Sequence, residues 1–419
     1  MHFLFSSMVL CSSFIVASEG IAWNLRDSLS GRSSWETPMK NPPLSPLAQE
    51  FLSEALEDLP GVIDSHVHVV CREKKNGCYV HPDLFSPLNH PVKSWKAKIL
   101  LSAMGAEDDD EPDESAKARL FDLVRNFPGK AYTPFLFAFA ATYDAETQAK
   151  RLDRTGLEVS NEYMLRLAKE LGDAIPVGSL NPFQADLETA FEALKKDGVR
   201  FLKLLPNSMH IPPDDLRCER FFELLAKHQF TLITHVGDER SVEGGGIENR
   251  FGAPMAYEAW LRKFPTLRIV FAHVGSEGES EYKGKSSDNV SWVLHLMKEF
   301  PQQTWADISG FTAAPMRTKF LQAILKEESV HARLLYGSDY PLPATKPLLA
   351  ASLWTMYLHG LLGGWADFSR TYKAALEIYN HNPLAAALVI MRKVSYSGKK
   401  FPASVFYDNV RNLLKMNLI

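Results

Sequence analysis

The sequence predicts an α/β protein folded as a closed (β/α)8 barrel, the TIM barrel. Eight short runs of β-branched or apolar residues recur along the chain, and each is followed by sequence with the spacing of an amphipathic helix. The runs are almost continuously apolar, which indicates strands buried on both faces, and therefore a parallel sheet covered by helices. Eight such units favour a closed barrel over an open doubly wound sheet, the alternative if some strands are miscounted.

The expected strands cover residues 62–70, 133–140, 175–180, 199–205, 231–236, 268–274, 304–309 and 334–339. Helical patterns lie between them at 185–198, 214–228 and 255–264, with Gly198 and Pro265 at expected helix ends. We assign residues 39–60 to an N-terminal helix, 61–345 to the barrel and 346–419 to C-terminal helices that cover one barrel end.

A long insertion separates the first two strands. Residues 71–131 exceed the usual length of a barrel connection, so we interpret them as a lid over the site. A helix is expected at 94–104, and the acidic stretch 105–115 is interpreted as a solvated loop. Cys71 and Cys78 could pair within this insertion, but two separate thiols are favoured because the four cysteines are few and scattered.

Composition and charge exclude some partners. The 419 residues are 46% hydrophobic, and 46 basic and 50 acidic side chains give a net charge of -4, which argues against nucleic acid. We expect a small-molecule substrate, and a homo-oligomer is compatible with the sequence. Residues 3–17 are apolar, but the run is short for a membrane span. Residues 1–18 could instead be a signal peptide, although no Lys or Arg precedes the apolar run, as the basic start of a signal peptide would require. Translation could also start at Met39, and we favour a cytoplasmic protein with residues 1–38 as leader or extension.

Polar residues gather where the predicted strands end. His66 and His68 share a face of the first strand, and His235, His273 and Asp339 follow apolar residues on three later strands. The carboxyl ends of all strands of a barrel meet at one mouth, so these five side chains are expected to meet there. A single buried histidine is more often a hydrogen-bonded core residue. Five such groups at one depth instead predict a shared metal ion, because burying them unpaired would cost several kcal/mol each.

These residues resemble the amidohydrolase superfamily, specifically its amidohydrolase-related branch. The resemblance rests on VIDSHVHV, FAHVGS, YGSDYPLP and the tail motif at 378–384, and it covers about residues 60–390. It implies a TIM barrel with one or two divalent ions. The branch contains hydrolases of amides and lactones and also metal-dependent decarboxylases. Its aromatic decarboxylases typically carry His-Pro-Trp on the fifth strand, where this chain has His235-Val236-Gly237, which favours hydrolysis.

The predicted function is a metal-dependent hydrolase that activates water to attack an amide, lactone or ester. The alternatives are a decarboxylase of a small aromatic or unsaturated carboxylic acid, and a metal-binding barrel without catalysis. The expected ion is one divalent metal, zinc in preference to manganese, iron or cobalt. Asp339 is the expected proton acceptor, and His273 is expected to polarise the carbonyl group. The expected metal ligands are His66, His68, His235 and Asp339.

For several other residues near the strand ends, the sequence leaves more than one role open. In the resembled superfamily a lysine at the position of Lys203 can be carboxylated and bridge a second ion; alternatively it binds an anionic substrate group or is structural. Asp64 lies deeper in its strand and is interpreted as structural, and Asp307 either orients a ligand or is structural. The candidates for substrate contact are His210, Glu239 and Arg240.

Overall fold

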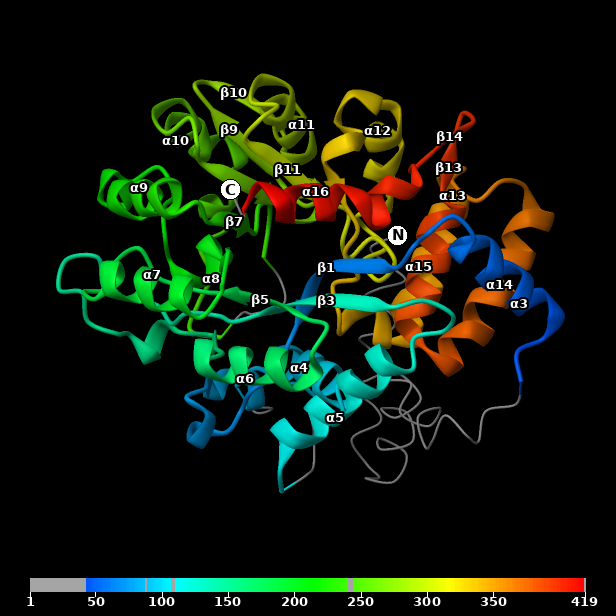
Figure 1. Ribbon diagram of the computed structural model, residues 1–419, viewed down its shortest axis with the longest axis horizontal. Coiled ribbons are helices and arrows are strands. Elements are labelled where there is room, and N and C mark those ends of the chain that lie inside the picture. The colour runs from blue at the N-terminus through cyan, green and yellow to red at the C-terminus, as the bar shows by residue number, and fades with distance from the viewer. Residues whose placement is uncertain (1–42, 87–88, 107–109, 240–243, 418–419) are drawn as a thin grey trace.

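Eight parallel strands form a closed barrel in the computed structural model, which describes residues 43–86, 89–106, 110–239, 244–417 (Figure 1). Their order around the sheet follows their order in the chain. The strands are β1 (Val62–His68), β3 (Tyr132–Phe137), β5 (Ile175–Gly178), β6 (Phe201–Leu204), β7 (Thr231–Thr234), β8 (Arg268–Phe271), β11 (Thr304–Asp307) and β12 (Leu334–Leu335). The predicted fold class and all eight predicted strands are therefore confirmed.

The barrel closes where β1 meets the residues after β12. Val67 forms a parallel bridge with Tyr340, the amide of His68 donates to the carbonyl of Tyr340 at 3.0 Å, and the amide of Asp339 donates to the carbonyl of His66 at 2.9 Å. The regular ladder of β12 ends at Leu335, earlier than the predicted 339. Asp339 has a φ of 64°, so the chain has turned out of the extended conformation there.

Helices on the outside alternate with the strands. They are α6 (Asn161–Leu171), α7 (Leu187–Lys196), α9 (Glu219–His228), α10 (Glu258–Lys263), α11 (Asn289–Glu299) and α12 (Leu321–Lys326). In α7 the buried residues are Leu187, Phe191 and Leu194, which recur at helical spacing and pack toward the sheet. The three helices predicted at 185–198, 214–228 and 255–264 are present, two of them shortened at the N-terminal side by 3-10 turns.

The insertion after β1 carries short elements and two helices. They are 3-10 turns at Lys74–Asn76 and Pro82–Phe85, β2 (Tyr79–Val80), which pairs with β4 (Leu157–Glu158), and the helices α4 (Pro91–Ala103) and α5 (Pro112–Arg125). The helix expected at 94–104 corresponds to α4. The prediction of a solvated loop over 105–115 is wrong for its C-terminal part, because α5 begins at Pro112 and Asp113 is fully buried.

The expectation of two free thiols is also wrong, because Cys71 and Cys78 form a disulfide with Cα atoms 5.6 Å apart. The 3-10 turn between them, ended by Gly77 at a φ of 71°, reverses the chain and brings the two cysteines together. Asp113 supports this turn by accepting hydrogen bonds from the amide of Arg72 at 2.6 Å and from Asn76 Nδ2 at 2.6 Å. Spacing in the sequence could not reveal this turn or its buried acceptor.

Terminal helices cover the amino end and one flank of the barrel. The helix α16 (Asp408–Met416) lies against the amino ends of the strands: Asn409 donates to the carbonyl of Leu334, and Asn417 accepts from Thr231 and Arg268 (Figure 1). At one flank, α3 (Pro46–Leu56), α14 (Trp365–His381) and α15 (Pro383–Lys393) pack together, and α13 (Lys346–Leu358) packs on α14. These helices leave the opposite, carboxyl end of the barrel for the site.

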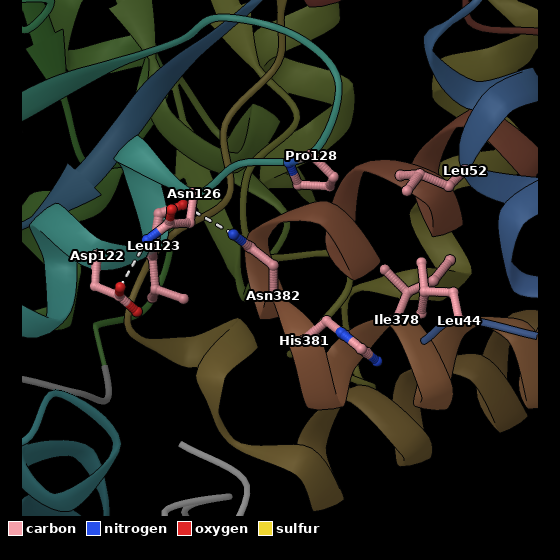
Figure 2. Close-up of a pocket in the computed structure, with 9 residues that line it drawn as sticks. All are labelled: Leu44, Leu52, Asp122, Leu123, Asn126, Pro128, Ile378, His381 and Asn382. Atoms are coloured by element: carbon pink, nitrogen blue, oxygen red, sulfur yellow. Dashed lines mark hydrogen bonds between the residues drawn. The ribbon is translucent and has the colours of Figure 1, made fainter. Parts of the chain in front are cut away.

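A cavity of about 580 Å³ lies where the start of the described chain, α5 and α14 meet (Figure 2). Asn382 borders it, caps α15 through the amides of Leu384 and Ala385, and donates to the carbonyl of Leu123 at 2.8 Å. The tail motif therefore does begin a helix, and it fastens that helix to α5.

The predicted leader, residues 1–38, lies outside the described residues. In the part of the chain that the structure describes, no helix has the length and hydropathy needed to cross a membrane.

Candidate metal centre

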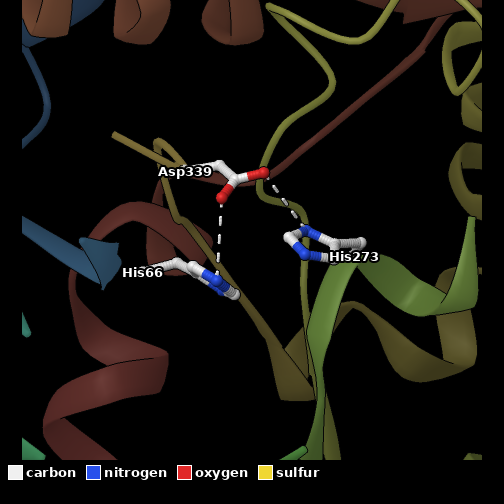
Figure 3. A group of neighbouring side chains, drawn as sticks. All are labelled: His66, His273 and Asp339. Atoms are coloured by element: carbon white, nitrogen blue, oxygen red, sulfur yellow. Dashed lines mark ion pairs between the residues drawn. The ribbon is translucent and has the colours of Figure 1, made fainter. Parts of the chain in front are cut away.

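Three of the five polar residues from the strand ends form a close group at the carboxyl end of the barrel, and the predicted ligands His68 and His235 lie beside this group. Donor atoms of His66, His273 and Asp339 all lie within 4.8 Å of one another, and all three side chains are buried. Figure 3 shows the Asp339 carboxylate between the two rings, with one oxygen 3.7 Å from His66 Nε2 and the other 3.7 Å from His273 Nδ1. His68 Nε2 lies 3.1 Å from Asp339 Oδ1, and the ring centre of His235 lies 5.3 Å from that of His273.

Asp307 orients the first of these histidines. Its Oδ2 lies 2.9 Å from His66 Nδ1, and its Oδ1 accepts the backbone amide of His273 at 2.9 Å. Ser309 Oγ lies 2.7 Å from His273 Nδ1. With Nδ1 of His66 engaged, its Nε2 faces Asp339, which is the arrangement that fixes a histidine for metal binding. The sequence left two interpretations of Asp307, a structural residue or one that orients a metal ligand. Its contacts with His66 and His273 favour the second.

Burial and charge set the ionisation of the cluster. Burial lowers the pKa of His66 to about 4 and holds the pKa of His273 well below its usual value, so both rings are neutral and can offer a lone pair. Burial alone would raise the pKa of Asp339. The positive charge that His273 can carry, a hydrogen bond from His68 and the Arg317 guanidinium instead hold that pKa well below its ordinary range.

Two residues of the cluster have an uncommon backbone conformation. His273 has a φ of 56° and Asp339 a φ of 64°, in the left-handed region that non-glycine residues seldom occupy. Such conformations carry a cost of about 1–3 kcal/mol each and persist where the surroundings impose them. Here the barrel mouth imposes them on two side chains that point at one another.

Lys203 and Asp64 lie beside the cluster. Lys203 Nζ is 3.4 Å from His66 Nε2 and 4.8 Å from the ring centre of Phe137, and burial lowers its pKa to about 8. Asp64 accepts hydrogen bonds from the hydroxyl of Tyr132 and from the amide of Ser338 at 2.8 Å, and burial raises its pKa to about 6. Its contacts tie β1 to the segment after β12, which agrees with a structural role.

The cluster forms the base of a cavity of about 1050 Å³, counted to its open mouth. His68, Lys203, His235 and Glu239 line it as well as the three clustered residues. Of the predicted substrate contacts, Glu239 lies in this lining. His210 is outside the lining and pairs with Arg154 through Nδ1 at 2.9 Å. Arg240 falls outside the described residues.

Sequence reasoning missed Arg317, whose guanidinium is buried in this lining. Its Nη1 lies 3.2 Å from Asp339 Oδ2, and its Nε lies 2.9 Å from Glu277 Oε1. Gly310 makes room for it, because a Cβ atom there would lie 2.1 Å from Arg317 Nη1. Arg317 follows a loop rather than a strand, so strand-end spacing gave no signal. Ser309 has the same strand parity as Asp307, and that parity could have found it.

A family model described as Amidohydrolase matches residues 63–358, which is well over half of the chain. The chain belongs to the amidohydrolase family. This confirms the resemblance that the strand-end residues predicted. No curated protein matches the chain in a sequence search.

Solved structures resemble this amidohydrolase at low sequence identity. An uncharacterized TIM-barrel protein from Bordetella bronchiseptica is 15% identical, with a TM-score of 0.48 over 86% of this chain and 100% of that one. A probable 2-pyrone-4,6-dicarboxylic acid hydrolase from Acinetobacter baumannii is 14% identical (TM-score 0.41, 70% and 92%). A 5-carboxyvanillate decarboxylase from Sphingomonas paucimobilis is 13% identical (TM-score 0.46, 85% and 99%). The family assignment rests on the sequence model alone.

The donor set of this amidohydrolase fits a divalent cation. Imidazole nitrogens and a carboxylate are ligands that zinc, manganese, iron and cobalt accept. His66 and His273 are neutral, Asp339 is ionised, and the three converge from β1 and from the ends of β8 and β12. Within the described part of the chain, this is the one group of three or more such side chains close enough to share an ion.

Proposed function

We propose that the protein is a metal-dependent hydrolase that activates water for attack on the carbonyl group of a small amide, lactone or ester. The observation that carries the proposal is the buried group of His66, His273 and Asp339 at the base of an open cavity. In a family that contains both hydrolases and decarboxylases, the sequence His235-Val236-Gly237 after β7 favours hydrolysis over the decarboxylase alternative.

Each side chain has a distinct proposed task. His66, His68, His235 and Asp339 would hold one divalent ion, which we assign as zinc. His66 and Asp339 belong to the close group of three, His68 Nε2 lies 3.1 Å from Asp339 Oδ1, and the ring centre of His235 lies 5.3 Å from that of His273. This ion would polarise a carbonyl oxygen and lower the pKa of water. Asp339 accepts the proton of the attacking water; its carboxylate is oriented for this by Arg317, 3.2 Å from Oδ2, and by His68, 3.1 Å from Oδ1. His273 belongs to the same close group, but its Nδ1, the nitrogen 3.7 Å from Asp339 Oδ2, is engaged by Ser309 Oγ at 2.7 Å, so we assign it the polarisation of the substrate carbonyl rather than a place among the ligands.

A single ion is the proposed state. Lys203 Nζ faces His66 Nε2 and the ring of Phe137, and Asp307, which could serve a second ion, is occupied by His66 and the amide of His273. A second ion would require carboxylation of Lys203, which its lowered pKa permits chemically. Lys203→Met therefore separates the two states: one equivalent of bound metal in both proteins supports the single ion.

The test combines metal analysis with a substrate screen. The purified protein should bind about one equivalent of metal, and His66→Ala or His68→Ala should lower that content sharply. Lactones, N-acyl compounds, esters and aromatic carboxylates are then screened. Asp339→Asn should reduce turnover by about 10³-fold or more while keeping much of the metal. Release of carbon dioxide from a carboxylate, with no hydrolysis of the other classes, would replace the proposal with the decarboxylase.

A further inference from the structure

The cavity above the candidate centre combines two kinds of surface. Its base is polar and carries the residues that would hold the ion. Its upper wall comes largely from residues 69–104, the segment that follows β1, and is apolar. The residues of this wall line the same cavity as the candidate centre, whose space of about 1050 Å³ includes open solvent at its mouth. The wall is therefore placed to receive a further part of the substrate.

The wall offers aliphatic and aromatic contacts. Val70, Leu84, Phe85, Leu100, Leu101 and Met104 contribute to it. Leu101 in α4 and Met104 directly after that helix are buried in the protein, at 9% and 3% exposure, so this end of α4 faces inward. A substrate group placed here would leave water and gain apolar contact, which favours binding in proportion to the number of buried methylenes.

Charged partners for an ionised tail are already engaged among the described lining residues. Among the described residues of segment 69–104, Arg72 is the one charged side chain in this lining. Its guanidinium lies 4.8 Å from the ring centre of Phe85 and donates to the carbonyl of Ala106 at 2.8 Å. At the base, Arg317 is held by Glu277 and Asp339, and Lys203 Nζ lies 3.4 Å from His66 Nε2 and 4.8 Å from the ring centre of Phe137. An ionised tail would lose its hydration against this wall with little in return.

We propose that the substrate is an uncharged carbonyl compound with an apolar chain or ring of several carbons, seated against Phe85, Leu100 and Leu101. This inference rests on the proposed hydrolase function and specifies its substrate class: amides, lactones or esters with a lipophilic group. The segment after β1 selects that group, and the strand ends act on the carbonyl.

Binding of unbranched methyl ketones tests the proposal, because they are uncharged carbonyl compounds that cannot be hydrolysed. Dissociation constants are measured by calorimetry on the metal-loaded protein for 2-butanone to 2-decanone. Affinity should rise by roughly 2- to 4-fold for each added methylene until the wall is covered. In the matched pair, 2-decanone should bind at least tenfold more tightly than 9-oxodecanoate, which differs by a terminal carboxylate. A flat series, or equal or tighter binding of 9-oxodecanoate, would overturn the proposal.

A variant pair on α4 locates the effect. Leu100→Ser should weaken 2-decanone binding by roughly 5- to 10-fold and leave 2-butanone unchanged. Trp95→Ser is the control, because Trp95 lies on the same helix, is 48% exposed and is outside the cavity lining. An unchanged chain-length series in Leu100→Ser, with folding confirmed by circular dichroism, would contradict the assignment. Normal ketone binding without hydrolysis of any ester, amide or lactone would instead count against the hydrolase function alone.

Discussion

Arg317 places a buried positive charge beside the candidate metal centre. Its side chain is 8% exposed and spans two carboxylates, with Nε on Glu277 and Nη1 on Asp339. A buried guanidinium in such a position compensates the charge of the buried Asp339 and of the partly buried Glu277, and its planar fork fixes the direction of each carboxylate. Arg317 contacts Oδ2 of Asp339 and His68 contacts Oδ1, and these two contacts together fix the orientation of the carboxylate.

Arg317→Met should lower the free energy of unfolding of the metal-free protein by about 3 kcal/mol, because it removes the guanidinium that contacts the buried Asp339 and the partly buried Glu277. Arg317→Lys should rescue little of this loss, since an ammonium group lacks the fork that reaches both acids. Urea denaturation measures both variants. Arg220→Met is the control: Arg220 pairs with Glu188 and Glu223 at the surface, and its loss should cost at most about 1 kcal/mol. Equal losses at the two arginines would contradict this account.

At the residue level, the sequence allowed us to predict those site residues that lie at the ends of strands. His66, His68, His235, His273 and Asp339 follow apolar runs, and parallel strands must bring such positions to one mouth. Arg317 and the buried Asp113 come from a loop and an insertion, where no periodicity relates sequence position to direction. Their partners lie 22 and about 40 residues away, and only the folded chain brings them together.

At the scale of elements, the segment after β1 is ordered by two local devices. The disulfide of Cys71 and Cys78 closes the turn, and Asp113 at the start of α5 holds the amides of Arg72 and Glu73 and the side chain of Asn76. Cys71 itself lines the cavity, and His68 lies three residues before it. Order in this turn therefore affects the cavity wall directly.

Cys78→Ser should loosen this turn. A disulfide that closes a loop this short contributes about 2 kcal/mol to the ordered state. We expect faster hydrogen exchange across residues 71–104 and a raised KM with a smaller change in kcat. A reducing agent should reproduce both effects in the wild-type protein and add nothing in Cys78→Ser. Identical exchange in the two proteins would show that Asp113 and its hydrogen bonds suffice to hold the turn.

A second element-level prediction concerns the hairpin of β9 (Glu279–Tyr282) and β10 (Lys285–Asp288). Glu258 of α10 holds this hairpin, because its carboxylate accepts from the Tyr282 hydroxyl at 2.6 Å and from Lys283 Nζ at 3.2 Å. Burial would raise the pKa of Glu258, but these bonds and one from Arg262 lower it to about 2. A pKa lowered by folding stabilises the protein above the unfolded value, and the stabilisation is lost as pH falls toward 2.

Glu258→Gln should therefore lower the free energy of unfolding by roughly 1–3 kcal/mol at pH 7. The difference from wild type should shrink as pH falls from about 5 toward 3, because the wild-type carboxylate then loses its advantage. Chemical denaturation at several pH values measures this difference. Glu279→Gln, in the exposed part of the same hairpin, is the control and should show little difference at any pH. A pH-independent loss in Glu258→Gln would indicate packing rather than charge.

At the scale of the whole molecule, the barrel was predictable because its signal repeats. Each of the eight buried parallel strands appears in the sequence as an apolar run. A wrong assignment of one run changes the predicted fold little when the seven others agree. The insertion and the disulfide occur once, so nothing in the chain corrects a wrong interpretation of them. The amino-end cover by α16 depends on Asn409 and Asn417, whose roles are visible only through the carbonyl and side-chain groups that they contact.

The candidate centre also bears on barrel closure. His66 and His68 lie on β1, and Asp339 follows β12, so the proposed ligands face each other across the seam where the first and last strands meet. That seam has a single parallel bridge, between Val67 and Tyr340. Its backbone bonds include those from Ser65 to Tyr336 and from His68 to Tyr340, at 2.8 and 3.0 Å. An ion shared by both sides would fasten the seam through side chains as well.

Metal removal should therefore weaken the seam more than the rest of the barrel. At a free metal concentration 1,000 times the dissociation constant, binding stabilises the folded state by about 4 kcal/mol, so chelation should lower Tm by several degrees. Hydrogen exchange should quicken at the amides of His68 and Asp339. It should remain nearly unchanged at the amide of Leu202 in β6, which pairs with Gly178 of β5 away from the seam. Asp339→Ala should abolish the dependence of both measurements on metal. Uniform quickening across all strands would mean that the ion stabilises the fold without closing the barrel.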